Sequence, residues 1–224
     1  MAQQRSLDAV LFDWRGTLVD DPPDEWWVRR ALERCGRAAD EDHVAEICAA
    51  LTRAADLPEV RAATAGCDCS QEAHRAYSSL YFRRAGLDDE FADALYALDL
   101  EAESHPFYPD ALPVVRELHE RGCRIALVSD IHVDLRPEFV AAGFDGSIDA
   151  YVLSFEHGVQ KPGRRIFEIA LEALDVDASR ALMVGDRASH DGGAIKAGIS
   201  TWLLPEGGSA DRARGLDRLL AFFP

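Results

Sequence analysis

Side chains that can bind a metal ion and a phosphate group stand directly after short apolar runs in this sequence. Asp13 follows the first run, Ser129 the second, and Asp186 and Asp191 the fourth, while Lys161 stands between the third run and a predicted helix. Carboxylates hold Mg²⁺, a hard ion that prefers oxygen ligands, and a lysine and a hydroxyl can stabilise the charge on a phosphate. These residue types fit Mg²⁺ as a cofactor and a small phosphorylated or otherwise anionic metabolite as a substrate.

The elements that must position these residues form an alternating pattern. Five unbroken apolar runs occupy residues 9–12, 125–128, 151–153, 181–184 and 202–204. Unbroken runs are expected for strands buried on both faces of a parallel sheet. Helical patterns occupy residues 109–121, 164–174, 191–197 and 210–222. We therefore expect a doubly wound α/β sheet, whose strands bring the polar residues together beyond their carboxyl ends.

Residues 21–104 interrupt this alternation with helical patterns alone. The patterns cover residues 25–35, 41–54, 71–85 and 89–103, and candidate N-caps precede them at Asp24, Asp40, Ser70 and Asp88. Prolines at 22, 23 and 106 would redirect the chain at the two ends of this segment. We predict an α/β core made of residues 1–20 and 105–224, and an inserted all-helical cap made of residues 21–104.

Four segments in order carry motifs of a known family. They read Val-Leu-Phe-Asp-Trp-Arg-Gly-Thr-Leu at 10–18, Val-Ser at 128–129, Lys-Pro at 161–162 and Val-Gly-Asp-x-x-x-x-Asp at 184–191. In these motifs and in the position of the helical insert, the whole chain resembles the haloacid dehalogenase-like hydrolase superfamily, with its Rossmann-like core. Most members of that superfamily transfer phosphoryl groups, so the resemblance implies a phosphatase-like hydrolase.

The resemblance also implies a role for each matching residue. Asp13 would attack phosphorus and form an aspartyl-phosphate, which splits one difficult step into two easier ones. Lys161 and Ser129 would bind the phosphate oxygens. The implied metal ligands are Asp13, the backbone carbonyl of Arg15, Asp186 and Asp191.

Arg15 departs from the family pattern, which has an aspartate at this position to protonate the leaving group and activate water. Arginine stays protonated near neutral pH and cannot exchange protons. General acid–base catalysis contributes about 10²–10⁴-fold, so we expect slow monoester hydrolysis unless another group substitutes. The candidates near the motifs are Asp20, Asp130, His132 and His190. Arg15 itself is expected either to contact an anionic substrate group or to pair with an acid of the cap. Trp14 beside it is expected to contact the substrate.

Two other functions remain open at this point. The first is a dehalogenase or an acyl-phosphate hydrolase, which needs no acid catalyst because its leaving group is good. The second is a catalytically silent relative that binds a phosphorylated ligand or a protein partner. Dehalogenases resemble the chain less at residues 184–191, where both acids of the metal-binding form are kept. Lysine-dependent phosphonate cleavage is disfavoured because residues 21–104 contain no lysine.

Composition limits the partners. The formal net charge is −16, which disfavours nucleic acid and anionic membranes. There is no apolar run of membrane-spanning length, and the first residues do not resemble a signal peptide. With five cysteines that cannot all pair, these features predict a cytoplasmic protein with reduced thiols. The sequence leaves both a monomer and a homodimer open.

Overall fold

A five-stranded parallel sheet forms the centre of the molecule. The computed structural model describes residues 7–205, 207 and 209–223, so the first six residues of the predicted core segment 1–20 lie outside it. The sheet has the order β3-β2-β1-β4-β5. The strands are β1 (Ala9–Phe12), β2 (Arg124–Ser129), β3 (Ala150–Leu153), β4 (Ala181–Gly185) and β5 (Ser200–Leu203). The predicted doubly wound parallel sheet is confirmed.

Pairing within the sheet brings the polar residues to one edge. Phe12 at the end of β1 pairs with Leu127 on β2 and with Val184 on β4. Because all three strands run in parallel, the residues that follow them meet beyond the same edge. Asp13 therefore stands between the ends of β2 and β4.

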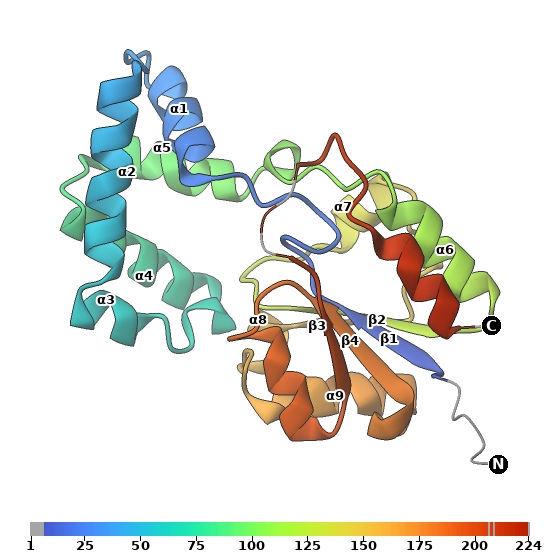
Figure 1. Ribbon diagram of the computed structural model, residues 1–224. Coiled ribbons are helices and arrows are strands. Elements are labelled where there is room, and N and C mark those ends of the chain that lie inside the picture. Colours follow the sequence, from blue (N-terminus) through green and yellow to red (C-terminus); the bar gives the residue numbers. More distant parts are fainter. Residues whose placement is uncertain (1–6, 206, 208, 224) are drawn as a thin grey trace.

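Helices cover both faces of the sheet (Figure 1). One face packs on α6 (Ala111–Glu120) and η5 (Leu216–Phe222), and the other on α9 (Arg164–Leu174) and η4 (Asp191–Ala197). Side chains alternate along β1, so Val10 and Phe12 join the first core cluster, whereas Ala9 and Leu11 join the second. Shorter elements complete this part: α7 (Arg136–Ala141), α8 (Ser154–His157) and η3 (Ala178–Arg180).

The last predicted helix, over residues 210–222, is shorter than expected. It forms only over η5, as a 3₁₀-helix, and residues 191–197 are likewise 3₁₀ rather than α-helical. Gly215, directly before η5, has a left-handed φ of +87°, which glycine adopts without steric cost. The carboxylate of Asp110 accepts the backbone N–H groups of Arg214, Gly215 and Leu216, so a side chain fixes the start of η5.

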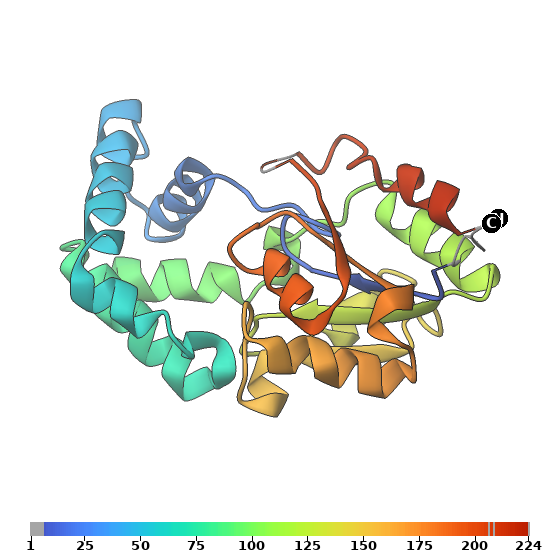
Figure 2. The same ribbon diagram turned by 60° about the horizontal axis from the view of Figure 1, so that its bottom comes forward.

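An all-helical unit lies to one side of the sheet (Figures 1 and 2). It contains α1 (Asp24–Arg34), α2 (Glu41–Ala55), α3 (Pro58–Ala63), η1 (Cys67–Cys69), α4 (Gln71–Arg84), α5 (Asp89–Asp99) and η2 (Ala102–Ser104). A separate apolar cluster holds it together, centred on Val28, Leu32, Val44 and Phe91. This unit is the helical cap that the sequence predicts; the sequence patterns did not indicate α3.

Three of the four predicted N-caps accept a backbone hydrogen bond at the start of a helix. The side chains of Asp40, Ser70 and Asp88 each accept an N–H three residues later. Asp24 is instead the first residue of α1, after an N-cap at Pro23 that has no side-chain acceptor. In that position Asp24 can still stabilise the positive end of the helix dipole.

Among the described residues, no helix has the length and apolar character needed to cross a bilayer.

Candidate active site

A buried lysine connects the predicted nucleophile to one of the predicted metal ligands. The Nζ atom of Lys161 donates hydrogen bonds to Oδ1 of Asp13 at 2.5 Å and to Oδ1 of Asp191 at 2.7 Å. Its side chain is 0% exposed, so these carboxylates supply the charge compensation that water cannot. They also raise the pKa of Lys161 against the effect of burial. Lys161 thus provides a permanent positive charge beside the Asp13 carboxylate.

The loop before Lys161 is held by a neighbouring acid. The backbone N–H of Lys161 donates to Oδ1 of Asp130 at 2.8 Å, and Asp130 directly follows β2. Burial raises the pKa of Asp130 to about 6, and its Oδ2 has no hydrogen-bond partner. Asp130 therefore positions the lysine loop against the sheet edge.

Asp13, Asp186 and Asp191 form a cluster of three buried acids. One ligand oxygen from each lies within 4.8 Å of the others. Burial raises the pKa of Asp13, and burial together with the Asp13 charge raises that of Asp186 to about 6. Both Oδ2 of Asp13 and Oδ1 of Asp186 are buried without a hydrogen-bond partner. Unpaired carboxylate oxygens that converge in this way fit a hard divalent cation such as Mg²⁺.

Two glycines allow the acids to approach the backbone. Gly16 adopts a left-handed φ of +74°, and a Cβ there would lie 2.1 Å from Oδ2 of Asp186. A Cβ on Gly185 would lie 2.3 Å from the carboxyl group of Asp191. Any side chain at either position would push an acid away, so space requires both glycines, and the backbone conformation also requires Gly16.

Ser129 and Arg187 complete the polar edge. Ser129 ends β2, is only 2% exposed and lines the same cavity as Asp13. The backbone N–H of Arg187 donates to Oδ2 of Asp191 at 3.0 Å, and its side chain lines the cavity. The surrounding acids, Asp13 first among them, raise the pKa of Arg187. Arg187 was missed from the sequence; its position directly after Asp186 was the available signal.

A cavity of about 580 Å³ lies between the sheet edge and the cap. The core contributes Asp13, Ser129, Lys161 and Arg187, among others. The cap contributes residues that the sequence analysis did not single out, including Thr64, Asp68, His74, Tyr77 and Asp99. The cavity is large enough for a small metabolite, and the core contributes most of the charged residues that line it.

Arg15 points to the cap. Its guanidinium donates to Oδ1 of Asp99 at 2.7 Å, and Nε2 of His105 lies 3.5 Å away. The guanidinium also lies 5.5 Å from the centre of the Trp14 ring, which is buried against His105. Of the two expected partners for Arg15, the structure shows the cap acid. Trp14 and Arg15 both line the cavity, where a substrate group could still reach them.

The four candidate replacements for the missing acid–base group are placed differently. Asp20 accepts hydrogen bonds from the Tyr108 hydroxyl and from a backbone N–H, and it is not among the residues that line the cavity. Asp130, His132 and His190 do line it. Burial lowers the pKa of His132 and of His190 to about 4. The pKa of Asp130, about 6, is closer to the neutral pH at which an acid–base catalyst would work.

Known proteins resemble the chain along most of its length. Residues 7–198 match the family described as haloacid dehalogenase-like hydrolase. The chain is 32% identical over 226 residues to ribulose-1,5-bisphosphate 5-phosphatase of Halopiger xanaduensis, an alignment that covers 94% of this chain and 90% of that protein.

Solved structures share the architecture. The magnesium-bound hydrolase YfnB of Bacillus subtilis aligns over 97% of this chain and 99% of its own, with a TM-score of 0.70 and 17% identity. The L-2-haloacid dehalogenase RSc1362 aligns over the same shares, with a TM-score of 0.70 and 20% identity. At these identities the likeness concerns the fold, and it includes the helical unit beside the sheet.

Proposed function

This chain belongs to the haloacid dehalogenase-like hydrolase family and is a phosphatase-like hydrolase, and we propose that it hydrolyses a small phosphate monoester with the help of Mg²⁺. The observation that carries the proposal is the buried arrangement of Asp13, Lys161, Asp186 and Asp191 at the sheet edge. Three converging carboxylates fit a metal-dependent phosphatase better than a metal-independent dehalogenase. The name of the Halopiger relative favours sugar phosphates as the first substrates to test.

In the proposed reaction, Asp13 is the nucleophile. Asp13, Asp186, Asp191 and the backbone carbonyl of Arg15 would hold Mg²⁺, which when bound neutralises charge on the phosphate and on the carboxylates. Lys161 holds Oδ1 of Asp13 and so fixes the orientation of this carboxylate. The Asp13 carboxylate attacks phosphorus, and the ester oxygen leaves with the bonding electron pair. Water then attacks the phosphorus of the aspartyl-phosphate and gives up a proton to the solvent, the P–O bond to Asp13 breaks, and phosphate and the free Asp13 carboxylate are released.

Charge stabilisation falls to the basic and hydroxyl groups of the cavity. Lys161 is fixed by two carboxylates, and the Arg187 side chain stands at the same cavity wall. With Ser129 they would bind the equatorial oxygens of the phosphate, where preorganised donors are most effective. Because Arg15 cannot act as a general acid, the leaving group must be activated or take its proton from water or from a group such as Asp130.

A substrate panel tests the proposal. Wild-type protein and Asp13→Asn are assayed in parallel on sugar phosphates, p-nitrophenyl phosphate, acetyl phosphate and 2-chloropropionate, each with Mg²⁺ and with EDTA. We expect Mg²⁺-dependent phosphate release by the wild type, with the highest rate on acetyl phosphate, and at least about a 10³-fold loss in Asp13→Asn.

The same panel, together with a binding assay for beryllofluoride and vanadate, separates the alternatives. Halide release that persists in EDTA would assign a dehalogenase. Tight binding of beryllofluoride or vanadate without turnover of any substrate would assign a silent ligand-binding relative. Either result would refute the proposed phosphatase.

A further inference from the structure

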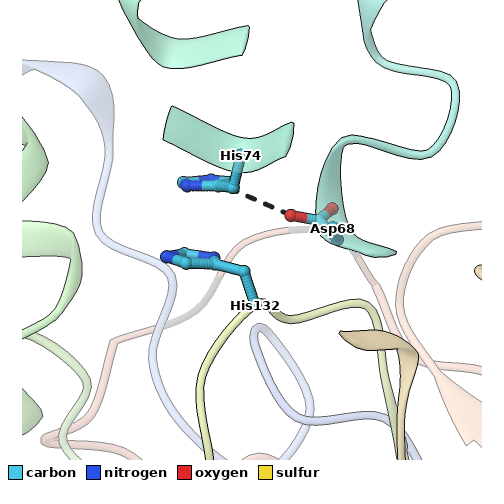
Figure 3. Close-up of side chains that lie close together, drawn as sticks. All are labelled: Asp68, His74 and His132. Atoms are coloured by element: carbon cyan, nitrogen blue, oxygen red, sulfur yellow. Dashed lines mark ion pairs between the residues drawn. The ribbon is translucent and has the colours of Figure 1, made fainter. Parts of the chain in front are cut away.

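A second group of metal-binding side chains lies across the junction of cap and core. Asp68 comes from η1, His74 from α4, and His132 from the core loop between β2 and α7. Figure 3 shows the two imidazoles stacked face to face with the Asp68 carboxylate beside them. The ring centres are 3.5 Å apart with 8° between the planes, and Nε2 of His74 lies 3.8 Å from Oδ1 of Asp68.

Most of the imidazole nitrogens in this cluster have no hydrogen-bond partner. Among the described residues, neither Nδ1 nor Nε2 of His132 has a partner, and the residue is only 3% exposed. Nδ1 of His74 is also buried and unpartnered. Leaving such groups unsatisfied costs about 1–3 kcal/mol each. None of the contacts among these side chains explains why two histidines stack here with free nitrogens.

Both histidines offer buried ring nitrogens that no hydrogen bond occupies. A neutral imidazole offers a nitrogen lone pair, which suits Zn²⁺ and similar ions better than Mg²⁺.

We propose that Asp68, His74 and His132 bind a divalent transition-metal ion of the Zn²⁺ class that joins the cap to the core. The ligand atoms lie within 4.8 Å of one another. Two ligands about 2.1 Å from one ion are at most about 4.2 Å apart, and the lone pair of an imidazole nitrogen lies in the ring plane. Binding therefore requires the two stacked rings to rotate until one nitrogen of each points at the ion. All three residues line the cavity, which leaves an open coordination position for water or for an oxygen of the substrate.

Backbone contacts already hold the ligands in place. The Ser154 hydroxyl donates to the backbone carbonyl of Asp68 at 2.6 Å and accepts the N–H of Ile131 at 2.9 Å. It therefore links the cap turn that carries Asp68 to the core residue directly before His132. Such support of the ligands by neighbouring groups is typical of metal sites. The proposal does not depend on the phosphatase reaction, since it uses other residues and another class of ion.

Cobalt titration tests the site directly. Metal-free Asp13→Asn/Asp186→Asn protein, in which the acid cluster is disabled, is titrated with Co²⁺ while the visible absorption is recorded. We expect one bound equivalent, with the d–d bands of a nitrogen-containing site of low coordination number, and displacement of Co²⁺ by Zn²⁺. The affinity should fall at least about tenfold in His132→Gln and in His74→Gln, and it should not change with the exposed His157→Gln.

Folding and cap position are followed separately. Circular dichroism and thermal melting in EDTA show whether each variant folds. If His132→Gln does not fold, His74→Gln, on a cap helix, is used to test the loss of affinity. If the Asp13→Asn/Asp186→Asn protein does not fold, wild-type protein in excess Mg²⁺ is titrated in its place. Zn²⁺ should also slow amide hydrogen exchange in α4 and in residues 130–135 together. Absence of a bound Co²⁺ equivalent in folded protein, or equal affinity in folded His74→Gln, would overturn the proposal, whatever the phosphatase assay shows.

Discussion

The two clusters of metal-binding side chains differ in how their charge is satisfied and in what holds them. The acids at the sheet edge are fixed by parallel strands and share a buried lysine, which donates to both Asp13 and Asp191. The histidine cluster is assembled from the cap and one core loop, and three of its ring nitrogens lack partners. A site on one sheet is built by the fold itself, whereas a site at the junction depends on how the cap rests on the core.

The largest expected effect concerns Lys161, which compensates the negative charge of the acids at the sheet edge. Lys161→Met leaves two buried carboxylates without their cation, and we expect the free energy of unfolding in EDTA to fall by about 3–5 kcal/mol. Urea denaturation measures this. Lys196→Met is the matched control, because Lys196 is the other lysine of the chain and is exposed. A loss below about 1 kcal/mol in Lys161→Met would mean that the lysine is not needed to hold the acids together.

Substitutions at the Arg15–Asp99 ion pair test whether the lack of an acid–base group at position 15 limits the rate of hydrolysis. Arg15→Asp/Asp99→Asn supplies a carboxylate at the family's usual position without placing it beside Asp99. If the missing acid–base group alone limits the rate, turnover of p-nitrophenyl phosphate should rise about ten- to a hundredfold. Asp99→Asn alone is the control for the lost ion pair. An unchanged rate in the double variant would show that another step limits hydrolysis.

The strands and the catalytic edge could be predicted from the sequence because they depend on local patterns. Unbroken apolar runs indicated the strands, and their parallel order brought Asp13, Ser129, Lys161 and Asp186 to one edge. The cap half of the cavity could not be predicted in this way. The approach of Asp68 and His74 to His132 depends on the angle between cap and core, which periodicity does not determine. Arg187 was missed although it directly follows Asp186 in the fourth motif.

Charge repulsion within the acid cluster predicts a stabilising substitution. The pKa of Asp186 is raised to about 6, so above that pH its ionised form costs the native state free energy, and metal-free stability falls as the pH rises from about 4 to 6. At pH 7 in EDTA, Asp186→Asn should raise the free energy of unfolding by about 1–2 kcal/mol. Adding Mg²⁺ should raise the melting temperature of the wild type more than that of Asp186→Asn. A variant less stable than the wild type in EDTA would contradict this account.

The smallest expected effect is at the cap junction, where burial and the Arg15 charge lower the pKa of His105 to about 4. The native state keeps this ring neutral while the unfolded chain takes up a proton near pH 6.5, so stability is full above pH 6.5 and is lost as the pH falls toward 4. Between pH 7 and pH 5, His105→Gln should lose about 1 kcal/mol less than the wild type in urea denaturation. Exposed His157→Gln should behave like the wild type. Equal losses in all three proteins would show that His105 is not held neutral.

The covalent intermediate on Asp13 offers the most direct test of the proposed function. Wild-type protein is mixed with Mg²⁺ and acetyl phosphate, quenched, and treated with borohydride, which reduces an aspartyl-phosphate to homoserine. Peptide mass spectrometry then identifies the modified residue. The account predicts homoserine at position 13, formed only when both Mg²⁺ and the phosphorylated substrate are present. Phosphate release with aspartate intact at position 13, or homoserine at another position, would contradict it.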